Sequence, residues 1–342
     1  MHRPGVYEIA LGMPIGDVVR QAGGPSEPPQ AILAGLARPG PRAAGTGYAR
    51  RIKLSLDCEQ TGGRRAMTED RTGDNPARAR HSAEIDPTVA HPARVYDYWL
   101  GGKDNFAADR EAAEQVIAAR PTILRDIRAN RALLRRAVWY LAAEAAIRQF
   151  LDIGTGIPTS PNVHQIAQAV APEARTVYVD NDAVVLSHAS ALLTSTPEGV
   201  TAYIDADLRT PDELLRQAAG TLDFTRAVAV VIVGTLHLIS DAEDPYGIVA
   251  RLLAATAPGS YLAITHPASD IHAEVAAEGA RRYNERVATK QTRRSFTDMA
   301  RFTEGLDLVE PGIVQSHRWR PAPGMRVEDY EVSGWAVVAR KP

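Results

Sequence analysis

The sequence predicts an α/β protein with a mostly parallel central sheet that helices cover on both faces. From residue 149 onward, short apolar runs alternate with stretches of helical periodicity. The apolar runs are continuous, which is typical of strands that are buried on both faces of a sheet. The last two runs, at residues 307–319 and 332–341, have no helix between them. We therefore expect the sheet to end in antiparallel strands.

Strands and helices are predicted in strict alternation over most of this region. The five predicted parallel strands are residues 149–154, 175–182, 200–208, 226–236 and 260–267. The four helices predicted between them are residues 161–171, 183–194, 211–219 and 245–257. The first of these helices begins with Pro161, and Ser160 is the expected N-cap.

A helical cap is predicted ahead of the first strand, over residues 86–148. Residues 92–102 and 105–119 form two shorter helices, and Asn105 is placed to cap the second. A longer amphipathic helix begins near residue 122, because apolar side chains recur there at spacings of three, four and seven. Residues 149–342 then form the main domain.

The bulk composition is that of a globular protein. The chain has 342 residues, a formal net charge of −2 and one cysteine, Cys58. The small net charge provides no general attraction to nucleic acid or to an anionic membrane. One cysteine excludes a disulfide framework within the chain. We find no apolar run near the length of a membrane helix and no signal-peptide pattern, so we expect a soluble cytoplasmic protein.

Residues 1–85 differ from the rest of the chain. Glycine, proline and polar residues dominate much of this stretch, which predicts disorder because little apolar surface can be buried. Residues 5–35 resemble part of the flavoprotein subunit of NADH-quinone oxidoreductases, without its flavin and iron–sulfur motifs. The stretch is either a small accessory module or a non-functional extension with Met67 as the true start, and we favour the second interpretation.

Polar clusters follow the predicted parallel strands. Asp152, Gly154 and Gly156 follow the first strand, and Asp180 and Asn181 the second. Asp205 and Asp207 follow the third strand, and Gly234, Thr235 and His237 the fourth. Ligands of open α/β sheets bind at these carboxyl ends. Singly, each cluster is also explained by a tight turn or a helix cap, but the ordered set predicts a ligand site.

The first cluster resembles a dinucleotide-binding loop that lacks its third glycine. Thr159 stands where G-x-G-x-x-G has the glycine that allows close packing beside a pyrophosphate. Asp180 lies 24 residues after Gly156, which is about where an acidic side chain binds a ribose diol. A nucleoside ligand without phosphates, such as S-adenosylmethionine, fits this pattern better than a dinucleotide.

At these residues the chain resembles the class I S-adenosylmethionine-dependent methyltransferases, and most of all an actinobacterial subgroup of S-adenosyl methyltransferases. The resemblance spans about residues 86–342 and implies a Rossmann-like, seven-stranded sheet with an antiparallel last strand. It implies that Asp152, Gly154 and Gly156 surround the methionine part of the cofactor. Asp180 would bind the ribose, Asn181, Asp207 and Leu208 would lie at the adenine, and Gly234, Thr235 and His237 would form the floor.

The stretch "RVYDYWLGGKDNF" at residues 94–106 is the distinctive feature of this subgroup. Tyr96, Lys103 and Asn105 are candidate cofactor-binding residues, because the stretch would form a lid over the site. An aromatic lid also attracts a sulfonium by cation–π contact. The alternative is that its aromatic residues are core residues of the cap and that its glycines end a helix.

Two histidines are candidate general bases for methyl transfer. His237 and His266 each follow a strand at the expected catalytic edge, and histidine titrates near neutral pH. Either one is equally explained as a structural histidine. The expected acceptor is a small molecule whose specificity lies in the cap and in residues 270–302, which either touch the acceptor or simply cover the sheet. No metal, nucleic acid or membrane partner is expected. A non-catalytic S-adenosylmethionine-binding protein and a nicotinamide-dependent oxidoreductase are the alternatives, and the oligomeric state stays open.

Overall fold

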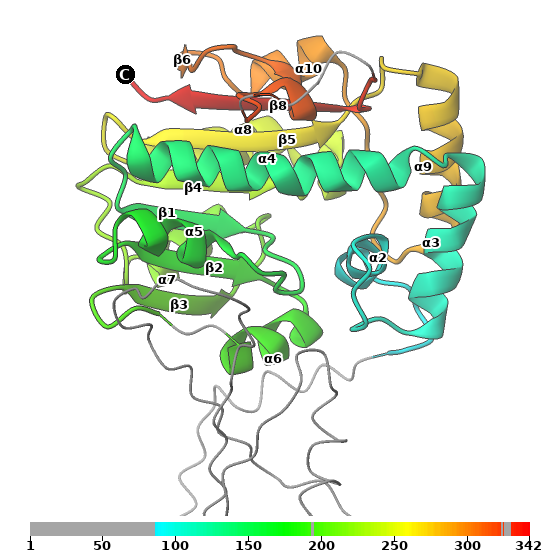
Figure 1. Cartoon of the computed structure of the whole chain (residues 1–342), viewed down its shortest axis with the longest axis horizontal. Coiled ribbons are helices and arrows are strands. Elements are labelled where there is room, and N and C mark those ends of the chain that lie inside the picture. Colours follow the sequence, from blue (N-terminus) through cyan, green and yellow to red (C-terminus); the bar gives the residue numbers. More distant parts are fainter. Residues whose placement is uncertain (1–85, 193–194, 323, 325–329) are drawn as a thin grey trace, which may run out of the picture. The chain divides into compact units, whose positions relative to one another are not determined.

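The structure is a computed structural model that describes residues 86–192, 195–322, 324 and 330–342 (Figure 1). The predictions for residues 1–85, including disorder, the start at Met67 and the position of Cys58, lie outside the described residues. The regular part of the chain, from residue 86 onward, contains the sheet, its helices and the cap.

The sheet has eight strands in the described part of the chain, in the order β3-β2-β1-β4-β5-β8-β6, with β7 pairing β8 off this path. The strands are β1 (Gln149–Ile153), β2 (Arg175–Asp180), β3 (Val200–Asp205), β4 (Ala229–Val233), β5 (Tyr261–Pro267), β6 (Asp307–Leu308), β7 (Val314–Gln315) and β8 (Gly334–Arg340). β1 to β5 are parallel, and β8 is antiparallel to β5. This confirms the mostly parallel sheet with an antiparallel last strand. The eighth strand arises because residues 307–319 form two short strands rather than one.

Two layers of helices cover the sheet, as the sequence predicts. α4 (Ile123–Ala143) and α5 (Val163–Val170) pack against one face, and α7 (Pro211–Ala218), α8 (Pro245–Ala254) and α10 (Phe296–Arg301) against the other. Successive strand residues point to opposite faces of the sheet. Phe150 therefore packs in the core beneath α4 and α5, and Leu151 in the core beneath α7, α8 and α10. Both cores are apolar, which explains why the strand sequences are continuous apolar runs.

The cap lies beyond the carboxyl ends of the parallel strands (Figure 1). α2 (Pro92–Trp99), α3 (Ala107–Ala119) and the start of α4 share a third apolar core with α9 (Ala273–Arg286). Trp99 of α2 and Tyr283 of α9 are both buried there, with ring centroids 6.3 Å apart. The prediction of a cap over residues 86–148 therefore did not include α9, because this helix is distant in sequence.

Two helices begin later than the sequence predicts. The N-cap of α5 is Asn162 rather than Ser160, because the Asn162 N–H donates to the side chain of Gln165 at 2.7 Å. The N-cap of α3 is Phe106 rather than Asn105, because the Phe106 N–H donates to Asp109 at 2.8 Å. In both cases a side chain one turn into the helix determines the start.

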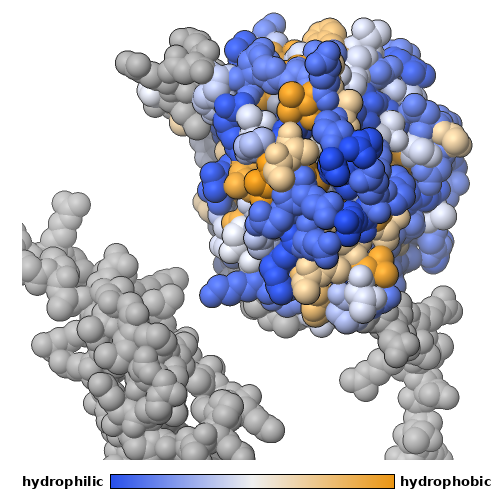
Figure 2. All heavy atoms as spheres, turned by 90° about the vertical axis from the view of Figure 1, so that its right-hand side faces the viewer, coloured by the Kyte–Doolittle hydropathy of each residue, from blue (hydrophilic) through white to orange (hydrophobic). Residues whose placement is uncertain are grey.

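The outer face of the cap is mainly hydrophilic, with smaller apolar patches between the polar side chains (Figure 2). Part of its charge lies on α9, where Arg281 pairs with Glu278 and Arg282 pairs with the same carboxylate at 2.8 Å. None of the helices in the described ranges has the length and apolar character needed to span a bilayer.

Candidate active site

One cavity lies where the parallel strands end, between the sheet and the cap. Residues at the ends of β1 to β5 line it, together with residues of α2, α4 and α9. The predicted site residues that line it are Tyr96, Asp152, Gly154, Gly156, Asp180, Asn181, Asp207, Leu208, Gly234, Thr235, His237 and His266. Lys103 and Asn105 are not among its lining residues. The fold thus brings all but two of the predicted residues to one site.

The two glycines after β1 are needed for different structural reasons. Both have positive φ, +70° at Gly154 and +65° at Gly156, which favours glycine. A Cβ on Gly154 would lie 2.1 Å from Oγ1 of Thr235, so Gly154 allows close contact with the β4 loop. A Cβ on Gly156 would meet no atom within 4 Å, so this glycine faces open space in the cavity. Gly156 therefore leaves room for a ligand.

Asp180, at the end of β2, organises the loop after β1. Its carboxylate accepts hydrogen bonds from the backbone N–H of Gly156 at 2.8 Å and of Asp182 at 3.0 Å. Burial raises the pKa of Asp180, and these two N–H donors oppose that rise. Beside it, the Asn181 side chain donates to Asp207 at 2.9 Å, so the loops after β2 and β3 are joined at the cavity.

Asp152 is a buried carboxylate at the end of β1. Burial raises the pKa of Asp152 to about 7, although the nearby charge of Arg131 acts to lower it. Arg131, on α4, is itself held by backbone carbonyls, donating to Thr159 and, at 3.0 Å, to Pro161. A carboxylate with so high a pKa lacks a full countercharge, and a bound cation would supply one.

Tyr96 connects the cap to the floor of the site. Its hydroxyl accepts a hydrogen bond from Asn130 of α4 at 3.0 Å. Gly234, after β4, has φ of +81°, and a Cβ there would lie 3.2 Å from the Asn130 amide. Sequence reasoning missed Asn130, and the signal it offered was a polar amide near the apolar face of an amphipathic helix.

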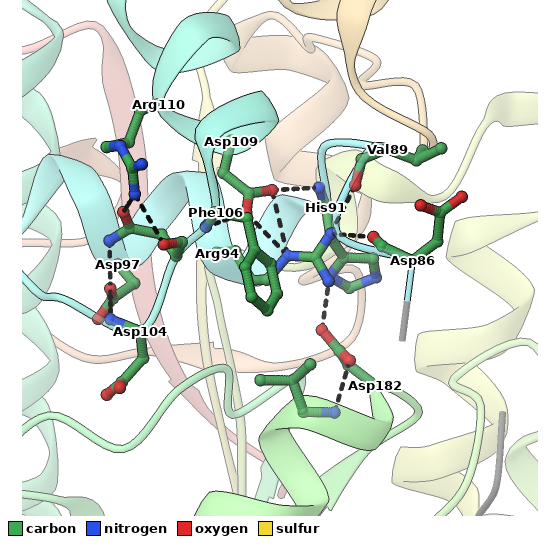
Figure 3. A network of polar contacts seen from close by, with 12 residues as sticks. Asp86, Val89, His91, Arg94, Asp97, Asp104, Phe106, Asp109, Arg110 and Asp182 are labelled. Atoms are coloured by element: carbon green, nitrogen blue, oxygen red, sulfur yellow. Dashed lines mark hydrogen bonds and ion pairs between the residues drawn. The ribbon is translucent and has the colours of Figure 1, made fainter. Parts of the chain in front are cut away.

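Most of the stretch at residues 94–106 forms a polar network rather than a ligand site (Figure 3). Arg94 pairs with the fully buried Asp109 at 2.9 Å. The Asp97 carboxylate accepts from the Asp104 N–H at 3.0 Å and from the Asn105 side chain at 2.8 Å. Lys103 is exposed. Trp99 is buried in the cap core, and Tyr96, Asp97, Trp99 and Leu100 of this stretch line the cavity.

The cap also contacts the loop after β2 directly. His91 Nδ1 lies 2.7 Å from a carboxylate oxygen of Asp182, a contact visible in Figure 3. Burial acts to raise the pKa of Asp182, but the hydrogen bond and charge of His91 outweigh it and the pKa is lowered. This contact ties the start of α2 to the residue that follows Asn181.

The two candidate histidines have different surroundings. His266 is held at both ring nitrogens: Nε2 accepts from Arg294 at 2.8 Å, and Nδ1 lies 3.1 Å from the Pro267 carbonyl, to which it donates. Burial, with the neighbouring His237 and Arg294, keeps the pKa of His266 well below its usual value. A neutral ring with both nitrogens engaged fits a structural role and does not fit a general base.

His237 has a free ring nitrogen. Its Nδ1 is buried and has no hydrogen-bond partner among the described residues. Burial lowers the pKa of His237 to about 3, and the charges of Arg293 and Arg294 contribute to the shift. His237 is therefore neutral at physiological pH, and its free Nδ1 can accept a hydrogen bond, although so low a pKa makes the ring a weak base.

Two family models match the sequence. The model described as S-adenosyl methyltransferase matches residues 78–342, and the model described as SLBB domain matches residues 1–54. No curated protein matches the chain.

Solved structures support the longer match. A DUF574 family protein from Streptomyces avermitilis is 48% identical, and the match covers 76% of this chain and 100% of that chain with a TM-score of 0.72. A protein from Thermobifida fusca that has been proposed to be a methyltransferase is 36% identical, covering 79% and 99% with a TM-score of 0.69.

The family match agrees with the site. A strand–glycine–helix start without a third glycine favoured S-adenosylmethionine over a dinucleotide, and the oxidoreductase and non-catalytic alternatives are set aside. The chain belongs to the S-adenosyl methyltransferase family and is an enzyme that uses S-adenosylmethionine as its methyl donor.

Proposed function

We propose that this methyltransferase acts in the cytoplasm on a small-molecule acceptor that binds between the sheet and the cap. One observation carries the proposal: a single cavity is lined both by the strand ends and by α2, α4 and α9. Donor and acceptor in one cavity can meet in line, and the cap shields them from water.

The cofactor-binding residues follow from the position of each strand end. Asp180 binds the ribose hydroxyls, Asn181, Asp207 and Leu208 lie at the adenine, and Asp152 holds the ammonium group of the methionine part. Gly154 and Gly156 let the backbone approach the ligand, and Gly234 and Thr235 lie beneath the methyl group. Of the proposed lid residues, Tyr96 lines the cavity, Asn105 supports the cap through its hydrogen bond to Asp97, and Lys103 is exposed outside the cavity.

The reaction is an in-line displacement at the methyl carbon. A lone pair of the acceptor forms the new bond, and the carbon–sulfur bond breaks with its electron pair passing to sulfur. The cofactor supplies the leaving group, so the protein mainly aligns the reactants. If the acceptor atom carries a proton, Nδ1 of His237 receives it, and His266 holds Arg294 in place.

We also propose that catalysis resides in residues 86–342, with residues 86–148 and α9 as the cap and residues 149–342 as the cofactor domain. The experiment is to incubate the full chain, and a chain that starts at Met67, with S-adenosylmethionine and a panel of small acceptors. Acceptor-dependent formation of S-adenosylhomocysteine by both chains supports the proposal. Formation by neither chain, with folded protein that binds the cofactor, contradicts a small-molecule acceptor from that panel.

A further inference from the structure

The cavity extends beyond the cofactor residues toward the cap. This part is lined by Arg120, Asp126, Tyr283, Arg293 and Ser333. These residues come from the end of α3, from α4, from α9, from the segment between α9 and α10, and from the residue before β8. These five residues form the acceptor side of the cavity, because none of them belongs to the clusters after β1, β2 and β3.

Arg293 is the charged group of this region that lacks a charged partner. Its Nε donates to the Ala268 carbonyl at 2.9 Å, and its Nη2 donates to the Ser333 hydroxyl at 2.8 Å and, weakly, to the Ser333 carbonyl at 3.4 Å. All these acceptors are neutral. Within the described ranges, no carboxylate lies at ion-pair distance from Arg293, and Nη1 donates to no group.

The neighbouring charges are compensated. Arg120 pairs with Asp126, and Arg294 pairs with Asp241 at 2.7 Å. His237 and His266 are neutral because their pKa values are lowered. One positive charge, that of Arg293, is left on this side of the cavity, and the sulfonium of the cofactor adds another.

A half-enclosed cation without a counterion is unfavourable until an anion binds it. Burial, together with the charge of Arg120, lowers the pKa of Arg293 to about 9, although the carboxylate of Asp126 acts to raise it. A carboxylate beside the guanidinium would restore the usual preference for the charged form. Arginine is also well suited to carboxylates, because its N–H groups form charge-assisted hydrogen bonds in a fixed plane.

We infer that the acceptor is a small carboxylic acid whose carboxylate binds Arg293 as an anchor, while a hydroxyl or amine elsewhere in the molecule faces His237 and takes the methyl group. The inference rests on the proposed function, because it assigns the acceptor side of the same cavity. The hydroxyl or amine forms the bond to the methyl carbon, sulfur keeps the electron pair of the broken bond, and the proton passes to His237. The product keeps its free carboxylate.

The charge of the acceptor also affects His237. Arg293 is one of the groups that lower its pKa. A carboxylate bound to Arg293 offsets that effect, so the bound acceptor makes His237 a stronger base.

The test compares acids with their amides on the full chain. The panel contains hydroxybenzoates, aminobenzoates and short hydroxy acids, each paired with its carboxamide. Methyl transfer is followed as S-adenosylhomocysteine formation, and binding to the S-adenosylhomocysteine complex is followed by calorimetry. We expect at least one acid to exceed its amide about 10- to 100-fold, the range expected for a hydrogen bond to a charged group.

Variants then assign the preference to Arg293. Arg293→Gln should remove most of the preference for the acid, and Arg293→Lys should restore part of it, while cofactor affinity stays within about twofold. Arg282→Gln, which removes an exposed arginine of α9, is the matched control and should change nothing. The inference is overturned if neither assay shows an acid that is preferred over its amide. It is also overturned if the preference for the acid survives Arg293→Gln. Failure of the folded wild-type chain to bind S-adenosylmethionine instead contradicts the proposed cofactor site.

Discussion

The carboxylate of Asp180 accepts a hydrogen bond from the backbone N–H of Gly156 at 2.8 Å, across the gap between the ends of β2 and β1. The proposed ribose-binding group therefore also positions the loop that contacts the methionine part of the cofactor. A hydrogen bond within the protein that fixes this loop reduces the ordering that binding requires.

Replacing this carboxylate should weaken cofactor binding. Asp180→Ala removes both the ribose acceptor and the support of Gly156, so we expect affinity for S-adenosylmethionine to fall at least about tenfold, given about 1.5–3 kcal/mol for hydrogen bonds to a charged group. Dissociation constants measured by calorimetry check this. Asp212→Ala, an exposed position on α7, is the control, and an unchanged affinity in Asp180→Ala would count against the assignment.

Alanine substitutions of the two glycines after β1 should have different effects on stability and on cofactor binding. Gly154→Ala places a Cβ against Thr235 in a left-handed conformation, so we expect a loss of about 3 kcal/mol in the free energy of unfolding. Gly156→Ala meets no neighbour, so we expect a loss of about 1–2 kcal/mol from backbone strain. Its main effect should be weaker cofactor binding. Denaturant unfolding and calorimetry separate the two, and equal stability losses would refute the distinction.

Cofactor affinity should depend on pH through Asp152. Its pKa is raised to about 7 in the free protein, and a bound ammonium group would lower it. Binding is therefore strongest above pH 7, where the carboxylate is already charged. Below that pH it weakens by up to about tenfold per unit until the lower pKa of the complex is reached.

The measurement is the dissociation constant of S-adenosylmethionine between about pH 5.5 and 7.0, the range in which the amino group of the cofactor stays largely protonated. Asp152→Asn should bind more weakly and show a flatter profile. A wild-type profile that is already flat would show that Asp152 does not face the ammonium group.

Substitutions of the two candidate histidines should have different effects, one on catalysis and the other on stability. With an acceptor that loses a proton, His237→Gln should lower kcat about 100-fold or more without changing cofactor affinity, because a general base contributes about 10²- to 10⁴-fold. His266→Gln should instead lower the melting temperature, because it disturbs the hydrogen bond from Arg294. Single-turnover rates and thermal unfolding test this, and the reverse pattern would exchange the two roles.

The pKa of His237 should rise when Arg293 is neutralised. Arg293 is the largest contributor after burial to the low pKa, so Arg293→Gln should move the titration of His237 upward from about 3. Nuclear magnetic resonance of the imidazole ring measures it. A titration curve that does not move would show that the two side chains are not coupled.

Neither Lys103 nor Asn105 should matter for the cofactor, and only Asn105 should matter for the stability of the cap. Lys103→Ala should leave both stability and cofactor affinity nearly unchanged, since the side chain is exposed. Asn105→Ala removes the hydrogen bond to Asp97, so we expect a loss of about 1 kcal/mol in the free energy of unfolding. A large loss of cofactor affinity in Lys103→Ala would restore the sequence-based prediction for that residue.

The sequence predicted the features that depend on local pattern. Continuous apolar runs located the parallel strands, and the polar residues that end them located Asp152, Asp180 and Gly234 at the cavity. It did not predict the partners that come from distant segments. Asn130 of α4 meets Tyr96 of α2 across 34 positions because these two helices pack together. α9 joins the cap because the chain returns to the same edge after the fifth parallel strand.

Side-chain competition explains the remaining differences. Asn105 is a good helix cap by type, yet its amide bonds to Asp97, and Asp109 takes over the N–H at the start of α3. His266 has the same residue type and a similar strand-end position as His237, but Arg294 occupies its Nε2. Such choices depend on which groups meet in three dimensions, which the pattern along the chain does not record.

The most direct test of the central claim is a calorimetric titration of the full chain with S-adenosylmethionine, S-adenosylhomocysteine and NAD. The account predicts micromolar binding of the first two, lost or strongly weakened in Asp180→Ala, and no binding of NAD. Folded protein that binds neither S-adenosyl compound, or that binds NAD instead, would contradict it.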